Sequence, residues 1–497
     1  MLSVLTFAAL CSFSAGCADA PGALSGIPEP RDNSRGVQIR DAAQLTGVRL
    51  AVMRLTGVGG QALISNAIPF PPGMLREEDL DRVQLFVAGN EQPIYIEALE
   101  GRHSDGSLRS ALVQFEHAMS RIVLAGELRI GQSRTVPDRP RKDITYDLQN
   151  PLPEAVALPA DPAYLTRTRV VGPAVSVSEA RTFSPTWVQR WTKTGDAKWA
   201  VHESDFKSVG LGWVLVRNFY DRSLANFAYW VMSGDPEYFK RGILYAIAYR
   251  ERYHRKYDYS VQPHETQIEG EALLYTLLGD EESRRGAQLN AEFMRDLWLP
   301  KLVDPTWKYT ANRPMARAIE AFLAARMVGA AGDWEGTLRT TLDAFLSQQS
   351  ADGAYRYPAQ CDASNNFQTG LFNDALIRYW EEFEEDARIL SALKRSADWL
   401  WNTQWLAAGG GFKYSETVCT LPNAGATVAA APDLNLLIVT TFGFVYQQTG
   451  DPRYLQQGDI VFQEGIKRAW FGNTATQADK QFNQQFRSAF RYFAYRR

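Results

Sequence analysis

Cysteine and histidine are scarce in this chain, which has 4 Cys and 5 His among its 497 residues. No Cys pair stands at zinc spacing, and neither an H-x-x-x-H pair nor an EF-hand loop occurs. P-loop, G-x-G-x-x-G and G-x-S-x-G motifs are also missing. The sequence therefore gives no reason to expect a metal or a cofactor.

Basic blocks and long apolar runs are likewise absent from the body of the chain. Lys and Arg number 53 against 56 Asp and Glu, a formal net charge of −3 that argues against a nucleic-acid partner. No stretch after the first twenty residues reaches the ~18 apolar residues of a membrane span. With 45% apolar and 22% charged residues, a chain of this length is typical of a globular protein with two domains.

Residues 1–20 have the features of a signal peptide. An apolar run is followed by small residues that end in the sequence ADA at 18–20, which offers a cleavage site. The sequence SAGC ending at Cys17 resembles a lipoprotein attachment box, so Cys17 would carry a lipid anchor. We expect an exported protein, either periplasmic, anchored to the outer membrane or secreted, with a polar linker over 21–40.

Short strands are predicted within residues 41–145, where apolar residues alternate or cluster between turn signals. The predicted strands are Val48–Val52, Val83–Val87, Ile94–Ile96, Leu108–Phe115 and Glu127–Ile130. We therefore expect a β-sandwich or β-barrel-like domain. A proline-rich connector over 146–205 would follow it.

Two phrases in this region carry a resemblance to a known family. They are I-P-F-P-P-G at 68–73 and H-S-D-G-S-L-R at 103–109. Together they resemble the N-terminal β-domain of the rhamnogalacturonan exolyase family, with His103, Ser104 and Ser110 in place of that family's Trp, Pro and Trp. The resemblance implies an accessory domain before a catalytic helical domain in a carbohydrate-active enzyme. A hairpin turn at Asp105-Gly106 would explain the second phrase without any function.

Helical periodicity dominates residues 206–497. In the unit at 351–401, apolar residues fall at helical spacing from Thr369 to Phe383 and again from Ile389 to Trp401. Acidic marks recur at the breaks, namely Asp235, Asp280, Asp333, Asp386 and Asp451. Because Gly suits the end of a helix and Asp the start of the next, we interpret this part as a repeated helical hairpin.

Such hairpins either stack into an open superhelix or close into a ring. The repeated G-D-P-x-Y phrases, the turns D-G-A-Y-R-Y and G-G-F-K-Y and the 12% aromatic content favour the ring. These features resemble the (α/α) toroids of polysaccharide lyases and of several glycoside hydrolase families. The resemblance implies that residues 206–497 form a catalytic (α/α) toroid, either incomplete or with six hairpins.

Polar residues precede the first helix of each hairpin, and in a toroid these positions would meet at one rim. Helix N-termini at such a rim would suit an acidic substrate. The expected catalytic residues are His264, Tyr259, Asn312, Arg313 and Asn366. The expected substrate-binding residues are Tyr257, Glu265, Tyr355, Arg356, Gln368, Lys413, Tyr414 and Asp433.

A rim rich in Asn, Arg, Tyr and His favours β-elimination from a uronic acid residue of an acidic polysaccharide. The reaction needs a group that neutralises the carboxylate, a base for the C5 proton and an acid for the leaving oxygen. Asn312, Arg313 and Asn366 would take the first role, and His264 and Tyr259 would share the other two. The predicted function is a metal-independent polysaccharide lyase.

Two other functions stay open at this point. A glycoside hydrolase would need two carboxylates ~5–9 Å apart, and Glu265 or Asp433 could supply one of them. A non-catalytic, lipid-anchored glycan-binding protein is the third interpretation. His264 could be an ordinary loop residue and Arg313 an ordinary helix-start residue.

Cys361 and Cys419 are the two cysteines outside the signal region. They lie in polar loops at equivalent places of neighbouring hairpins. In an oxidising compartment we expect them to form a disulfide, the alternative being two buried thiols.

Overall fold

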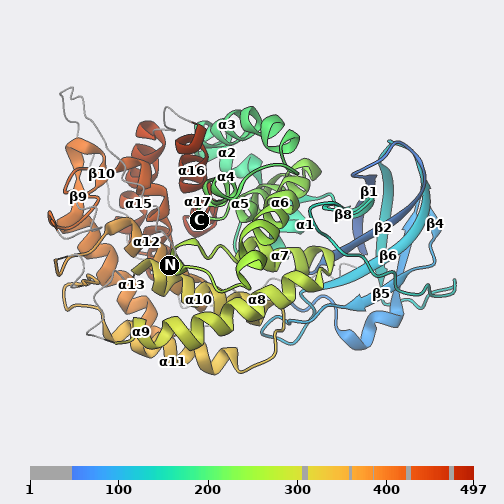
Figure 1. Ribbon diagram of the computed structural model, residues 1–497, viewed down its shortest axis with the longest axis horizontal. Helices are drawn as coiled ribbons and strands as arrows, with labels where there is room; N and C mark the ends of the chain where they lie inside the picture. Colours follow the sequence, from blue (N-terminus) through green and yellow to red (C-terminus); the bar gives the residue numbers. More distant parts are fainter. Residues whose placement is uncertain (1–46, 305–311, 358–360, 384–385, 421–426, 470–474) are drawn as a thin grey trace.

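The computed structural model describes residues 47–497 apart from 305–311, 358–360, 384–385, 421–426 and 470–474 and the side chains of 475–478. The predicted signal peptide (1–20), the linker (21–40) and Cys17 lie outside the described residues. The chain forms an N-terminal β-domain followed by a larger, mostly helical domain (Figure 1). No helix in the described ranges is long and apolar enough to cross a membrane.

Within the described residues the β-domain is one curled sheet of eight strands. The strands are β1 (Gly47–Arg54), β2 (Gly60–Pro69), β3 (Val83–Val87), β4 (Asn90–Glu91), β5 (Tyr95–Ala98), β6 (Ser110–Met119), β7 (Leu124–Ile130) and β8 (Ala155–Pro159). Their order is β4-β3-β7-β1-β8-β2-β6-β5, with β2 and β6 paired antiparallel over their whole length. Side chains alternate along β1, so Val48, Leu50 and Val52 enter the core.

The predicted strands correspond to β1, β3, β5, β6 and β7, but the sequence pattern does not predict β2 or β8. Most of β2 and all of β8 are buried, so neither shows the alternation of a half-exposed strand. Strand β8 lies between β1 and β2, which extends the β-domain to Pro159. The stretch predicted as a connector thus contains β8 and three helices: α1 (Pro162–Arg167), α2 (Val177–Phe183) and α3 (Pro185–Ser204).

The two phrases that resemble the exolyase family contact each other in the β-domain. The Gly73 amide donates to the Ser107 hydroxyl over 2.8 Å, and the Ser107 hydroxyl donates to Asp105 over 2.6 Å. Gly106 has a φ of +80°, which confirms the predicted turn at Asp105-Gly106. These hydrogen bonds give both phrases a structural role.

The helical domain is built from hairpins that follow one another along the chain. The first helices are α5 (Arg222–Ser233), α7 (Glu269–Leu278), α10 (Asn312–Met327), α12 (Asn366–Phe383) and α14 (Val439–Thr449). The second helices are α6 (Pro236–Tyr249), α8 (Glu281–Phe293), α11 (Trp334–Ser347), α13 (Ala387–Trp399) and α15 (Pro452–Arg468). Further helices are α4 (Leu211–Asn218), α9 (Leu299–Leu302), α16 (Ala475–Phe486) and α17 (Ala489–Tyr495).

The turns between paired helices use the predicted capping chemistry. The carboxylates that accept first-turn amides are those of Asp235, Asp280, Asp333, Asp386 and Asp451. Gly234, Gly279 and Gly450 end α5, α7 and α14 in the left-handed conformation that Gly adopts without strain. The predicted hairpin repeat is confirmed at these positions.

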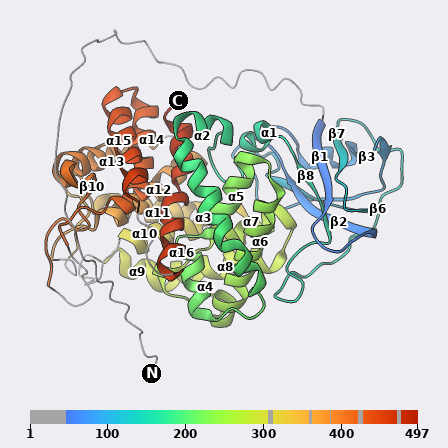
Figure 2. The ribbon, with the colours of Figure 1, turned by 90° about the horizontal axis from the view of Figure 1, so that it is seen from above.

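The first helices are almost wholly buried, as α5 and α10 show, whereas second helices such as α13 are buried along one face and exposed along the other. Figure 2 shows the helices from above. Along the buried layer, α5 contacts α7, α7 contacts α10, α10 contacts α12, α12 contacts α14 and α14 contacts α17. Helix α16 contacts both α17 and α5. Glycines permit this close approach: a Cβ at Gly270 would lie 2.5 Å from the Ser223 Cβ, and one at Gly443 would lie 2.7 Å from the Tyr492 ring.

The β-domain packs against the C-terminal ends of the first helices. Leu112 belongs to the same buried cluster as α7, and the Tyr275 hydroxyl near the end of α7 accepts the Glu100 amide over 2.7 Å. Arg109 forms an ion pair with Glu382 near the end of α12. The N-terminal ends of these helices therefore lie away from the β-domain.

Candidate functional site

Hydrogen bonds tie the N-terminal ends of neighbouring first helices together. Asn312 at the start of α10 donates to Thr369 Oγ1 on α12 over 3.1 Å, and Asn366 donates to the Lys413 carbonyl over 2.7 Å. Both asparagines are buried. In this structure they hold the helix starts in place, and their predicted role toward the substrate carboxylate stays a prediction.

Two arginines, one lysine and one histidine gather near these helix starts. We call these four residues, His264, Arg313, Arg317 and Lys480, the cation cluster. Arg313 and Arg317 are one turn apart on α10, whereas Lys480 comes from α16. Burial, assisted by the charges of Arg313 and Arg317, lowers the pKa of His264 to about 3. The structure thus brings the predicted His264 and Arg313 together, with a neutral imidazole at pH 7.

Two aromatic residues after α4 lie against the cluster. The guanidinium carbon of Arg313 is 5.7 Å from the Phe219 ring centroid, and the Lys480 ammonium is 4.9 Å from the same centroid. Tyr220 is fully buried and hydrogen-bonded to Arg313; burial nevertheless raises the pKa of Tyr220 to about 12. Tyr414 interacts electrostatically with both Tyr220 and Arg313, and it is half-buried.

Lys480 connects the cluster to solvent. Its side chain is exposed, whereas those of His264 and Arg313 are half-buried. The surrounding protein desolvates the ammonium and Arg313 repels it, so the pKa of Lys480 falls to about 8 although Asp433 opposes the shift.

Tyr259, the other predicted acid or base, lies elsewhere and packs against α8. Its hydroxyl donates to Glu282 of α8 over 3.2 Å, and a Cβ at Gly286 would lie 2.4 Å from its ring. Burial and the carboxylates of Glu271 and Glu282 raise the pKa of Tyr259. Arg250 works to lower this pKa but is outweighed, so the surroundings of Tyr259 do not favour a basic phenolate.

Other predicted substrate-binding residues take structural positions. Tyr355 is fully buried with its ring 4.9 Å from that of Phe372, and Gln368 is buried as well. Arg356 forms ion pairs with Asp352 and Glu416 at 2.6 Å.

Four more of the predicted residues lie in the segments that connect the helices. Glu265 accepts a hydrogen bond from Tyr253 over 2.9 Å, and the Lys413 ammonium donates to the Thr403 carbonyl over 3.2 Å. Tyr257 is exposed. The Asp433 carboxylate accepts hydrogen bonds from Gln481 and Gln484 of α16 over 3.1 and 3.3 Å. Asp433 also interacts electrostatically with Lys480 of the cation cluster.

Beneath the cation cluster, Arg487 joins three buried carboxylates. It lies 2.6 Å from Glu269 and 3.2 Å from Asp374, and it also pairs with Glu320. Burial works to raise the pKa of Glu320, but Arg317 and Arg487 outweigh it and lower that pKa. All three carboxylates are thus bound to an arginine from inside the fold. No group of three or more His, Cys, Asp or Glu arranged to hold a metal occurs in the described part of the chain.

Sequence reasoning missed Phe219, Arg317 and Lys480 and did not select Tyr220. The dipeptide Tyr220-Asp221 precedes a helix as the other expected site residues do, so Tyr220 could have been found. Arg317 stands four residues after Arg313, which places both on one helical face. Lys480 gave no local signal, because it meets Phe219 across about half of the chain.

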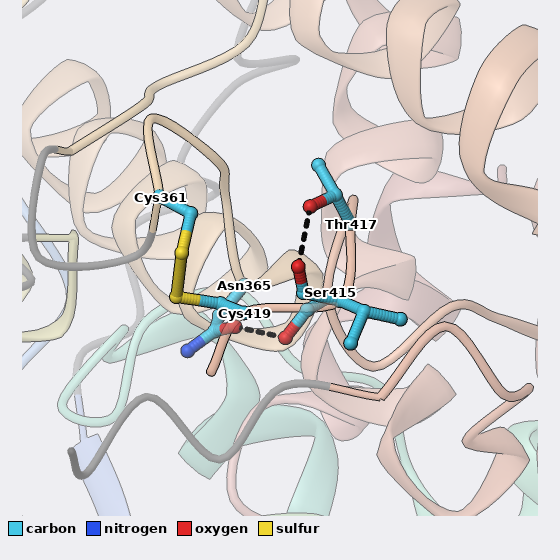
Figure 3. The surroundings of a disulfide bond; sticks show 6 residues. Cys361, Asn365, Ser415, Thr417 and Cys419 are labelled. Atoms are coloured by element: carbon cyan, nitrogen blue, oxygen red, sulfur yellow. Dashed lines mark hydrogen bonds between the residues drawn. A yellow bond between two sulfur atoms is a disulfide. The ribbon is translucent and has the colours of Figure 1, made fainter. Parts of the chain in front are cut away.

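The predicted disulfide between Cys361 and Cys419 is confirmed, with a sequence separation of 58 residues (Figure 3). It joins the loop before α12 to the loop that carries Tyr414. Close to it, the Ser415 hydroxyl donates to Asn365, and the two residues pair as a β-bridge. The disulfide therefore fixes two loops beside the helix starts.

Replacing both cysteines with serine is expected to lower the free energy of unfolding by roughly 4 kcal/mol, because a closed loop of this length restricts the unfolded chain. The measurement is urea denaturation of the double variant beside the oxidised wild type. Reduced wild-type protein should behave like the variant. Equal midpoints for all three samples would contradict the expectation.

No family model matches this sequence, and no curated protein matches it. Among solved structures, the chain is similar to the Lin0763 protein from Listeria innocua, with 11% identity and a TM-score of 0.39. That similarity covers 57% of this chain and 86% of the other.

Proposed function

We propose that the protein is a polysaccharide lyase that cleaves a uronic-acid-containing glycan by β-elimination. The observation that carries the proposal is the cation cluster, which reaches solvent at the helix starts beside Phe219, Tyr220 and Tyr414. Positive charge there suits the substrate carboxylate, whose neutralisation makes the C5 proton acidic. The half-buried rings of Phe219 and Tyr414 beside the charges suit a sugar ring.

The same proposal includes a closed arrangement of the helices. The contacts from α5 through α7, α10, α12 and α14 to α17, with α16 against α5, support an (α/α) toroid. In that arrangement the starts of the buried helices form one rim, with the β-domain at the opposite end. The similarity of the β-domain phrases to the rhamnogalacturonan exolyase family agrees with such a two-domain enzyme.

Roles follow from the surroundings of each side chain. Arg313, half-buried and beside Phe219, would bind the substrate carboxylate. Tyr414, half-buried and electrostatically coupled to Arg313, would protonate the leaving oxygen. His264 is neutral and would accept a hydrogen bond from a sugar hydroxyl; a bound carboxylate would offset the charges of Arg313 and Arg317 and raise the pKa of His264.

A glycoside hydrolase is the weaker enzyme proposal. Asp433 is near Lys480, but Glu265 is bound to Tyr253, and Glu269, Glu320 and Asp374 are buried against arginines. Inverting and retaining hydrolysis both need two carboxyl groups that reach the sugar. A non-catalytic glycan-binding protein would use the same cluster without the proton transfers.

Export belongs to the proposal as well. The signal-like residues 1–20 favour it, and the Cys361–Cys419 disulfide is typical of an oxidising compartment. A lipid on Cys17 would then anchor the enzyme at the outer membrane.

Incubation with a panel of polyuronides tests the reaction. We expect ultraviolet absorbance from a new C4=C5 bond to rise together with reducing ends. Reducing ends without that absorbance would indicate a hydrolase. Binding without either signal would indicate the non-catalytic protein, and both results contradict the lyase.

A further inference from the structure

Lys480 is the group at the rim whose chemistry the roles above leave unused, and several contacts fix its position. Its ammonium lies 4.9 Å from the Phe219 centroid and 6.0 Å from the Tyr220 centroid. Arg313 on α10 and Asp433 before α14 face it as charged groups. Lys480 thus lies next to the residue that would bind the substrate carboxylate.

The residue before Lys480 anchors this stretch of α16. Asp479 is buried, 2.7 Å from Arg222 on α5 and 3.4 Å from His202 on α3. Burial works to raise the pKa of Asp479, but His202 and Arg222 lower it to about 2, so the carboxylate is charged. With Asp479 held inside the fold, the backbone at Lys480 is fixed while its side chain stays exposed.

We propose that Lys480 is the catalytic base that removes the C5 proton of the bound uronate. The inference rests on the proposed lyase function and deepens it. Arg313 would hold the carboxylate on C5, so a base beside Arg313 stands next to the proton that becomes acidic. The lowered pKa, about 8, supports the role because a useful fraction of the amine is neutral near neutral pH.

The step balances without any further reactant. The lone pair of neutral Lys480 takes the C5 proton, and the electrons of the C5–H bond form the C4=C5 bond while the C4–O bond breaks. The leaving oxygen takes the hydroxyl proton of Tyr414. A proton then returns from the Lys480 ammonium to the Tyr414 phenolate, which restores both groups.

Lys480→Arg and Lys480→Ala test the inference, with Lys394→Arg on α13 as the matched control. We expect Lys480→Arg to lower kcat about 10³-fold with little change in KM, because it keeps the charge and loses the base. Added methylamine should restore part of the activity of Lys480→Ala. The wild-type kcat/KM should rise with pH through about 8, since the deprotonated amine is the active form, and Lys480→Arg should lose that dependence.

A measurement independent of turnover accompanies these assays. Reductive ¹³C-methylation and NMR titration of the wild type, with Lys480→Arg for assignment, should show one lysine that titrates near pH 8. A titration above pH 10, where ordinary lysines titrate, or a fully active Lys480→Arg variant would overturn the role of Lys480 and leave the lyase function intact. A wild type that yields no unsaturated product from any polyuronide would overturn both.

Discussion

Replacing Arg313 with alanine is expected to lower kcat/KM on a polyuronide by about 10³-fold. Arg313 joins every part of the site: it repels the proton of His264, hydrogen-bonds Tyr220 and lies against Phe219. Without it, the substrate carboxylate would keep its full charge as the C5 proton leaves. The measurement is the initial rate of ultraviolet absorbance at several substrate concentrations.

A second substitution at Arg313 distinguishes the effect of its positive charge from that of its guanidinium geometry. Arg313→Lys should recover a part of the lost rate, because it restores the charge but not the planar pair of donors. Arg388→Ala is the control, since Arg388 is exposed and pairs with Asp386 and Asp343 on the outer helices. An Arg313→Ala variant that keeps the wild-type circular dichroism and more than a tenth of the activity would contradict the assignment.

Replacing Arg487 with methionine is expected to lower the free energy of unfolding by about 4 kcal/mol. The change leaves Glu269, Glu320 and Asp374 buried with one cation fewer. Each of these carboxylates still pairs with one other arginine, namely Arg378, Arg317 or Arg491. These remaining pairs limit the decrease in stability. Urea denaturation at neutral pH measures the effect.

The acid dependence gives a second readout for the same variant. In the wild type the pKa of Glu320 is lowered below its unfolded value, so its contribution to stability is present above the unfolded pKa and is lost as pH falls through the folded one. Without Arg487, the free energy of unfolding should therefore fall less between neutral and acid pH than it does in the wild type. Arg468→Met is the control: its pair with Glu464 is partly exposed and should contribute less than about 1 kcal/mol. Equal destabilisation by the two substitutions would contradict the prediction, because the buried ion pairs of Arg487 would then contribute no more to stability than a partly exposed pair.

Several structural features could be predicted from local sequence because they depend on neighbouring residues. The Asp caps and Gly ends of the hairpins are of this kind, since both act within one turn. The pairing of Cys361 with Cys419 followed from equivalent positions in successive hairpins. His264 and Arg313 were chosen for the same reason, as polar residues directly before or at the start of a first helix.

Local sequence did not indicate which way a side chain faces. Asn312 and Asn366 also stand at helix starts, and Tyr355 lies on a turn between helices, but all three side chains are buried. Tyr259 follows the end of an outer helix and packs on α8. Spacing along the sequence does not distinguish a residue that faces the next helix from one that faces solvent.

By itself the sequence determined the two-domain order, the helical repeat with its caps, and the cysteine pair. Only the tertiary structure decided that Lys480 meets Arg313, Phe219 and Tyr220, and that Arg487 neutralises carboxylates from three different helices. Caps and turns are set by interactions within a few residues. The charge of a site depends on groups that are hundreds of residues apart, and packing of the whole domain brings them within a few ångströms.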